Sequence, residues 1–167
     1  KYIILYSFLF FISISTFTSC GEDDLDESTF GKIKVERNEF DSWLLDNYIK
    51  PYNIDLKYRF EDIESDMSYN LVPAELEKSK EMAKLIKHLW LGAYDEVCGE
   101  IFMKQYGPRI INLIGSSAVN PDSKTEVLGT ADKGIKVTLY KINSLDKTNI
   151  ELLNLYYFRT MHHEFAH

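Results

Sequence analysis

The chain has 167 residues, of which 45% are hydrophobic and 14% aromatic, and its formal net charge is −7 with histidine neutral. This length suits one ordinary domain, and the apolar fraction is sufficient for a packed core. An acidic protein is repelled by phosphate backbones, so the composition argues against a nucleic-acid partner.

The first residues have the order of a secretory signal. Lys1 supplies a positive charge, an apolar and hydroxyl-bearing run covers residues 2–16, and small residues precede Cys20. The run is short for a membrane-spanning helix, which needs roughly 20 apolar residues. We therefore predict a signal peptide over residues 1–19; a single membrane anchor that stays attached is the alternative.

The residues around this cleavage site, F-T-S-C at 17–20, resemble a bacterial lipobox, with Phe17 in place of the usual Leu. In such signals the chain is cut before the cysteine, whose thiol carries a lipid, so the resemblance implies lipidation of Cys20. The sequence GEDDLDES follows; it cannot pack, which indicates a solvated acidic tether over residues 20–33. This acidic run is similar to the signal that sends Bacteroidetes lipoproteins to the cell surface, although a plain charged linker would look the same. We expect an outer membrane lipoprotein exposed at the cell surface.

After the tether, the pattern predicts a helix and then a strand. In residues 37–50, RNEFDSWLLDNYIK, Asn38 can cap a helix whose apolar side chains recur at helical spacing, and Pro51 is expected to end it. Residues 53–60, NIDLKYRF, alternate between apolar and polar side chains, as a half-buried strand does.

The longest helical stretch extends from Pro73, which suits a first turn, to Gly107, which suits a helix end. An apolar stripe along it predicts one buried face, and Gly92 is expected to kink or split it. Cys98, within this stretch, is predicted to be a small buried hydrophobe. Since the chain has only 2 cysteines, no disulfide framework is implied.

The next segments alternate between extended structure and turns. Residues 109–115 predict a short strand, residues 116–124 a turn-rich loop, and residues 126–130 and 135–142 two further strands. Either of these two could be a sheet edge that pairs with an extended peptide, or simply an ordinary strand. We predict an α+β fold, with a long helix and a small mixed or antiparallel sheet ahead of a final helix.

That final helix is expected over residues 148–167, where Thr148 and Glu151 would form a capping box. Its last five residues read H-E-x-x-H. On a helix, His163 and His167 differ by about 40° of rotation and roughly 6 Å of rise, so both imidazoles project from one face. Zinc accepts imidazole ligands, and a catalytic site takes three ligands from the protein. We predict both histidines as zinc ligands.

Glu164 is rotated by about 100° from His163, too far to be a third ligand of the same cluster. It can instead reach a water on the metal, acting first as general base and then as proton donor to the leaving amine. The metal lowers the pKa of that water to about 7 and polarises the scissile carbonyl. We predict Glu164 as the catalytic residue.

The motif in its context, TMHHEFAH at 160–167, together with the lipoprotein signal, resembles the zinc-binding metallopeptidase lipoproteins of Bacteroidetes, the substrate import-associated zinc metallohydrolases, and zincins generally. The resemblance implies a zincin-like domain over residues 34–167, with Zn²⁺ as cofactor and a peptide or protein as substrate. It further implies membrane attachment through the lipid and a place beside an outer-membrane nutrient importer. Zincins take a third ligand downstream of the motif; we therefore expect this domain to be incomplete and inactive alone, with its third ligand beyond His167.

Two alternatives stay open. The protein could be a catalytically inactive accessory lipoprotein that binds peptide or glycan, or a structural lipoprotein with a chance motif. A ligand within the next few tens of residues would favour an enzyme. Of the other candidates, His162 is expected to pack or meet solvent, His88 to lie on the surface, and Trp43 and Trp90 to belong to the core.

Overall fold

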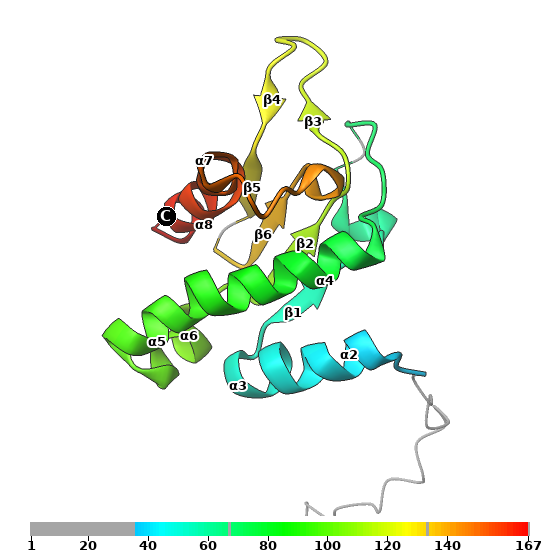
Figure 1. The fold of residues 1–167 in the computed structure, drawn as a ribbon. Coiled ribbons are helices and arrows are strands. Elements are labelled where there is room, and N and C mark those ends of the chain that lie inside the picture. The colour runs from blue at the N-terminus through cyan, green and yellow to red at the C-terminus, as the bar shows by residue number, and fades with distance from the viewer. Residues whose placement is uncertain (1–35, 67, 133, 167) are drawn as a thin grey trace, which may run out of the picture. The chain divides into compact units, whose positions relative to one another are not determined.

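The computed structural model describes residues 36–66, 68–132 and 134–166 (Figure 1). The predicted signal peptide, tether, lipidation site Cys20 and second motif histidine His167 lie outside these residues. The described helices, including π-helical and 3-10 turns labelled η, are α2 (Glu39–Leu44), η1 (Leu45–Ile49), α3 (Lys50–Tyr52), η2 (Asp62–Glu64), α4 (Leu76–Leu85), η3 (Ile86–Leu91), α5 (Gly92–Cys98), α6 (Glu100–Tyr106), η4 (Ile142–Ser144), α7 (Ile150–Leu153), η5 (Asn154–Phe158) and α8 (Arg159–Ala166). The strands are β1 (Asp55–Lys57), β2 (Ile110–Leu113), β3 (Ala118–Val119), β4 (Glu126–Val127), β5 (Gly129–Asp132) and β6 (Lys136–Leu139).

The first helix runs from α2 through η1 to α3. Its predicted cap is confirmed, because the Asn38 side chain accepts a hydrogen bond from the Asp41 N–H at 2.7 Å and the Asp41 carboxylate accepts one from the Asn38 N–H at 3.0 Å. The prediction that Pro51 ends the helix is wrong. The helix continues to Tyr52 and stops at Asn53, whose φ of 56° is left-handed. The widened π-helical turn before Pro51 accommodates a residue that has no N–H to donate.

The predicted long helix is broken in a different place from that expected. α4, η3 and α5 are continuous through Gly92, and the break comes at Gly99, whose φ of 84° favours glycine. Pro73 does not start the helix; it forms a bridge with Ile114 instead. Gly107 ends α6 as predicted.

The face that this helical run buries is confirmed at its centre. Ala83, Ile86 and Trp90 are fully buried, as the apolar stripe predicts. Cys98 is exposed, which corrects the prediction of a buried thiol. It is the last residue of α5 and lies on the solvent side, where the helix leaves the core.

A four-stranded sheet has the order β1-β2-β6-β5, with β1, β2 and β6 parallel and β5 antiparallel to β6 (Figure 1). The predicted α+β class and mixed sheet are therefore confirmed. The alternation predicted for residues 53–60 holds, since Ile54, Leu56 and Tyr58 are buried, but only β1 pairs within the sheet. The loop predicted over residues 116–124 contributes β3, which pairs with β4 in a separate two-stranded ribbon.

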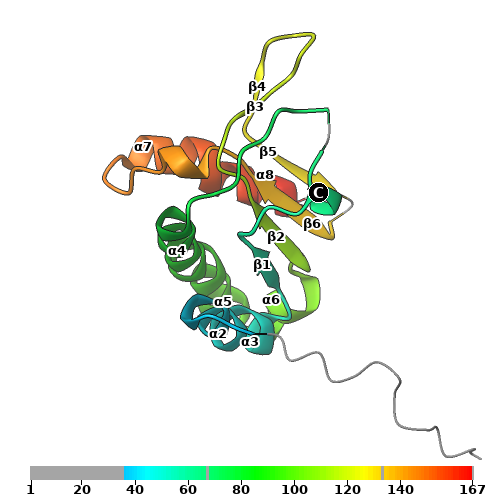
Figure 2. The same ribbon diagram turned by 90° about the vertical axis from the view of Figure 1, so that its right-hand side faces the viewer.

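One face of the sheet carries the main core. In both views α4 and α8 lie on the same side of the sheet (Figures 1 and 2). Ile111 and Leu139 from the sheet join Trp90 and Met161 from the helices in one buried cluster. Trp43 packs against this cluster, so both tryptophans belong to the core, as predicted. None of the helices in the described ranges is long and apolar enough to cross a bilayer.

Candidate active site

The cap of the helix that carries the motif lies one residue later than predicted. Asn149 caps it, with its side-chain oxygen accepting a hydrogen bond from the Leu152 N–H at 3.0 Å. The predicted Thr148–Glu151 capping box is therefore wrong. The Thr148 hydroxyl donates to Asp146 at 2.6 Å instead, and the same carboxylate accepts the Thr148 N–H at 2.9 Å. This local turn takes the hydroxyl that the capping box would have needed.

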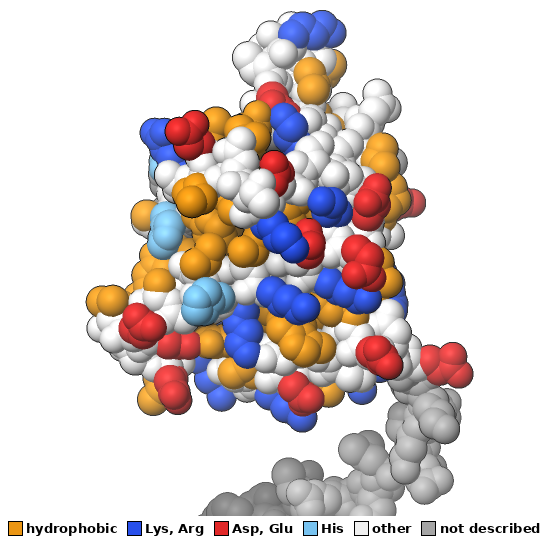
Figure 3. All heavy atoms as spheres, viewed as in Figure 1, with side chains coloured by type: hydrophobic (Ala, Val, Ile, Leu, Met, Phe, Trp, Pro, Cys, Tyr) orange, Lys and Arg blue, Asp and Glu red, His pale blue; other side chains and the backbone are white. Residues whose placement is uncertain are grey.

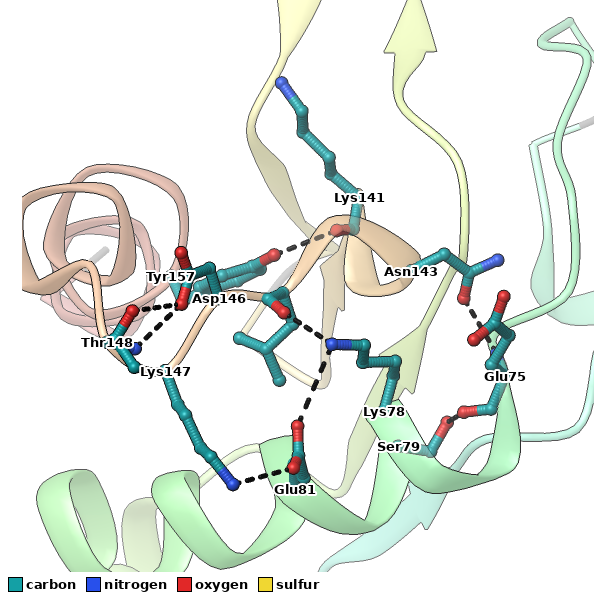
Figure 4. A network of polar contacts seen from close by, with 11 residues as sticks. Glu75, Lys78, Ser79, Glu81, Lys141, Asn143, Asp146, Lys147, Thr148 and Tyr157 are labelled. Carbon is teal, nitrogen blue, oxygen red and sulfur yellow. Dashed lines mark hydrogen bonds and ion pairs between the residues drawn. The ribbon is translucent and has the colours of Figure 1, made fainter.

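A buried stripe fixes the rotation of this helix, which is continuous through α7, η5 and α8. Leu153, Tyr157 and Met161 follow one another at intervals of four residues and are 6%, 3% and 0% exposed. The Tyr157 hydroxyl also donates to the Lys141 carbonyl at 2.9 Å (Figure 4). Because this face packs in the core, Arg159 and His163 on another face of the helix are left exposed.

The connection that leads into the motif helix is tied to α4 by charged side chains (Figure 4). Lys78 donates to the Leu145 carbonyl at 2.8 Å, and Lys147 pairs with Glu81 at 2.9 Å. These contacts join segments more than sixty residues apart in the sequence and hold the start of the helix in place.

An aromatic cluster holds the far end of α8. The Phe165 ring meets Trp90, Tyr94 and Phe102 edge-on, with centroid distances of 5.6, 5.2 and 6.2 Å. Such edge-to-face pairs add to the stabilisation that burial alone provides. His162 joins the same cluster: its Nδ1 lies 3.1 Å from the Tyr94 hydroxyl. His162 is exposed and also contacts this neighbour, so both expected placements hold.

A groove with a volume of about 490 Å³ lies between α8 and the β5 side of the sheet. Its lining includes Gly129 from the strand and Arg159, Thr160, His163 and Glu164 from the helix. Strand and helix come closest at Gly129, where an added Cβ would lie 2.5 Å from Thr160 Cγ2. Glycine is required here because any side chain would meet the helix.

Two of the predicted site residues thus come together in this groove. His163 is exposed and Glu164 is half-buried, and both line the cavity. His167, the other predicted ligand, lies outside the described residues. Within the described ranges no group of three or more His, Cys, Asp or Glu side chains could hold a metal ion. The imidazole of His163 suits zinc, and the remaining donors would have to come from elsewhere.

The sheet distinguishes between the two strands predicted as candidates for peptide pairing. β6, within residues 135–142, lies between β2 and β5 and is paired on both sides. β5, which overlaps the segment 126–130, lies at the edge and borders the groove. An edge strand has backbone groups that can pair with another chain. Of these two candidates, β5 rather than β6 can therefore take that role.

A cluster of polar side chains links the ribbon to the motif helix. Lys141 Nζ lies 3.1 Å from Glu126 and 3.1 Å from the Tyr156 hydroxyl, and the Ser117 hydroxyl donates to Glu126 at 2.5 Å. The bond with Tyr156, and then Glu126, raises the pKa of Lys141. The bond from Ser117, and then Lys141, lowers the pKa of Glu126. The start of β4 is thereby linked to η5 of the motif helix.

The sequence reading missed two groove residues. Arg159 lies four positions before His163, so extending the motif spacing backwards would have found it. Gly129 gives no comparable signal, because its importance depends on a helix that follows it by thirty residues. His88 is exposed, as predicted.

Comparison with known proteins identifies the family. Residues 32–167 match the family described as "Putative zinc-binding metallo-peptidase". The crystal structure of a putative zinc-binding metallo-peptidase from Bacteroides caccae is 52% identical, with a TM-score of 0.62, and the match covers 78% of this chain and 51% of that one. No curated protein matches.

The chain therefore belongs to this zinc-binding metallo-peptidase family, and the resemblance inferred from its motif is confirmed. It spans about half the length of the Bacteroides caccae relative. Lipidation, cell-surface location and a link to nutrient import stay predictions.

Proposed function

We propose that this chain carries the catalytic helix and the substrate-aligning strand of a zinc-dependent peptidase of the zincin class. The observation that carries the proposal is that His163 and Glu164 line one groove, bounded on its other side by the antiparallel strand β5 at the sheet edge. A peptide extended along β5 would lie beside both side chains. Their residue types are those that metal-assisted hydrolysis needs.

Each group has a distinct role in this proposal. His163 and His167 would hold the zinc, and a third protein ligand would complete the site. Zinc, when bound, polarises the scissile carbonyl and acidifies a water. Glu164 takes the proton from the attacking water and then delivers it to the leaving amine. The backbone of β5 pairs with the substrate and holds its scissile bond in the groove.

The test is Glu164→Gln in the full-length protein. We expect hydrolysis of a casein or mixed-peptide substrate to fall by at least about a hundredfold, since general acid–base catalysis contributes roughly 10²–10⁴. Zinc content, measured by elemental analysis, should not change. Glu151→Gln is the matched control, because Glu151 is an exposed carboxylate of the same helix at its opposite end.

Unchanged hydrolysis in Glu164→Gln would remove this residue from the mechanism. A wild-type protein that holds zinc and binds peptides without cleaving them would support the accessory-lipoprotein alternative. A full-length protein without zinc would support the chance-motif alternative.

We also propose that the protein is anchored to the outer membrane through a lipid on Cys20 and acts on peptides or proteins captured beside a nutrient importer. The support is the lipobox-like stretch before Cys20 and the acidic run after it. Cys20→Ser should move the protein from the membrane fraction to the soluble fraction and remove the mass of the lipid. Retention of the variant in the membrane fraction would contradict lipid anchoring at this residue.

A further inference from the structure

Arg159 is a second functional group in the groove. It is the first residue of α8, is exposed, and lines the same cavity as His163 and Glu164. It lies four positions before His163, which corresponds to one helical turn and a rise of roughly 6 Å. The guanidinium therefore belongs to the face that presents the motif.

Arg59 and Arg109 have hydrogen-bond or ion-pair partners within the protein, whereas Arg159 has none in the described ranges. Arg59 pairs with Asp41 at 2.6 Å, and Arg109 donates to two backbone carbonyls at 2.9 and 3.1 Å. Arg159 makes no hydrogen bond or ion pair with any residue in the described ranges, and this includes Glu164, with which it shares the groove. Its five N–H donors are thus available to a ligand.

We propose that Arg159 determines specificity by binding a carboxylate of the peptide substrate, an inference that rests on the peptidase function proposed above. A guanidinium binds a carboxylate through two parallel hydrogen bonds, which gives both strength and direction. An extended peptide advances about 3.3 Å per residue, so one helical turn corresponds to about two substrate residues. The carboxylate therefore lies within about two residues of the scissile bond.

This carboxylate can be an Asp or Glu side chain or the C-terminal carboxylate of the peptide. The 167 residues carry a net charge of −7, which repels acidic peptides at a distance. An unpaired cation inside the groove reverses that preference locally. The selectivity thus depends on one side chain, which makes it open to a direct test.

The experiment compares three matched peptides. The first carries a side-chain carboxylate, with Glu near the cleavage site and an amidated C-terminus, and the second carries only a C-terminal carboxylate, with Gln at that position. The third has Gln and an amidated C-terminus, and so carries neither carboxylate. In wild-type full-length protein we expect kcat/KM to be about tenfold higher for at least one carboxylate peptide than for the uncharged one. Arg159→Gln should abolish that ratio, mainly through a higher KM for the carboxylate peptides. Arg159→Lys should restore it in part, because a single point charge replaces the bidentate contact. The preference should also weaken as salt is added.

Arg37→Gln is the control, because Arg37 is exposed but does not line the groove. Equal kcat/KM for charged and uncharged peptides, or a ratio that survives in Arg159→Gln, would overturn the proposal and leave the peptidase function intact. The same peptides are also titrated against Glu164→Gln protein by fluorescence anisotropy. If the wild type cleaves none of the peptides, the proposed peptidase function fails. The proposal for Arg159 is then tested separately, by whether the carboxylate peptides bind more tightly than the uncharged one.

Discussion

The two faces of the motif helix follow the same four-residue spacing but are built on different principles. Leu153, Tyr157 and Met161 are buried against the sheet and α4, whereas Arg159 and His163 face the groove and are exposed. The buried face depends on apolar packing, which the amino-acid pattern itself specifies. The exposed face acquires its meaning only from β5, which reaches it from another part of the chain. Packing residues should therefore control stability, and groove residues should control chemistry.

The strongest test of this comparison is Met161→Ala. Met161 is fully buried in the main core, so its truncation leaves a cavity and should lower the free energy of unfolding by about 2–5 kcal/mol. Arg159→Ala, two positions away on the exposed face, should change it by less than about 0.5 kcal/mol. Urea denaturation with unchanged slopes would measure both values. If the two variants lost similar stability, the division of the helix into a packing face and a groove face would be wrong.

A smaller effect is expected where the groove face meets the strand. Gly129→Ala places a Cβ 2.5 Å from Thr160 Cγ2, so the variant should lose about 1–3 kcal/mol of folding stability through overpacking. Thr160→Ser removes that methyl group and should recover much of the loss in the double variant. A double-mutant cycle on the free energy of unfolding measures the coupling. Simple additivity of the two changes would show that strand and helix are not in contact at this point.

These contacts also explain how much of the fold and of the candidate site could be predicted from the sequence. Local patterns predicted elements that the structure contains. These patterns are the alternation around Leu56, the helical spacing around Trp90 and the motif at His163. The break at Gly99 was missed because Gly92 and Gly99 look alike in sequence and only the backbone separates φ values of −61° and 84°.

The groove was harder to predict than the motif that lines it. Which strand forms the edge depends on sheet order, and the sequence left two candidate segments open. Arg159 can be placed on the motif face by its spacing from His163, but the groove that it lines exists only because Gly129 allows β5 to approach α8. Long-range proximity of this kind is absent from local sequence patterns.

The start of the helix provides a third test. Asn149→Ala removes the side chain that accepts the Leu152 N–H and should cost about 1 kcal/mol of folding stability. Thr148→Ala is the matched control. Its hydroxyl bonds an exposed carboxylate and not the helix, so the loss should stay below about 0.5 kcal/mol. Thermal unfolding of the two variants would rank them, and the reverse order would restore the Thr148 capping box that the sequence predicts.

The smallest effect is expected from Glu126, in the polar cluster beside the helix. The Ser117 hydroxyl and then Lys141 lower the pKa of Glu126 below its ordinary 4.5. Its contribution to folding is therefore complete above pH 4.5 and is lost as the pH falls through the lower, folded-state pKa. The side chain is 32% exposed, so Glu126→Gln should cost no more than about 0.5 kcal/mol at pH 7, and less below pH 4.5.

Urea denaturation of wild type and Glu126→Gln across this pH range provides the measurement, and a difference that grows on acidification would contradict the sign of the shift. The buried face should behave differently over the same range. Burial raises the pKa of Tyr157 to about 12, so its hydroxyl stays protonated and keeps donating to the Lys141 carbonyl in acid. We expect acid to weaken only the Glu126 contacts, and Tyr157→Phe to lower the free energy of unfolding by the same amount at every pH tested. That result would show that the buried stripe, and not the charges around it, anchors the motif helix.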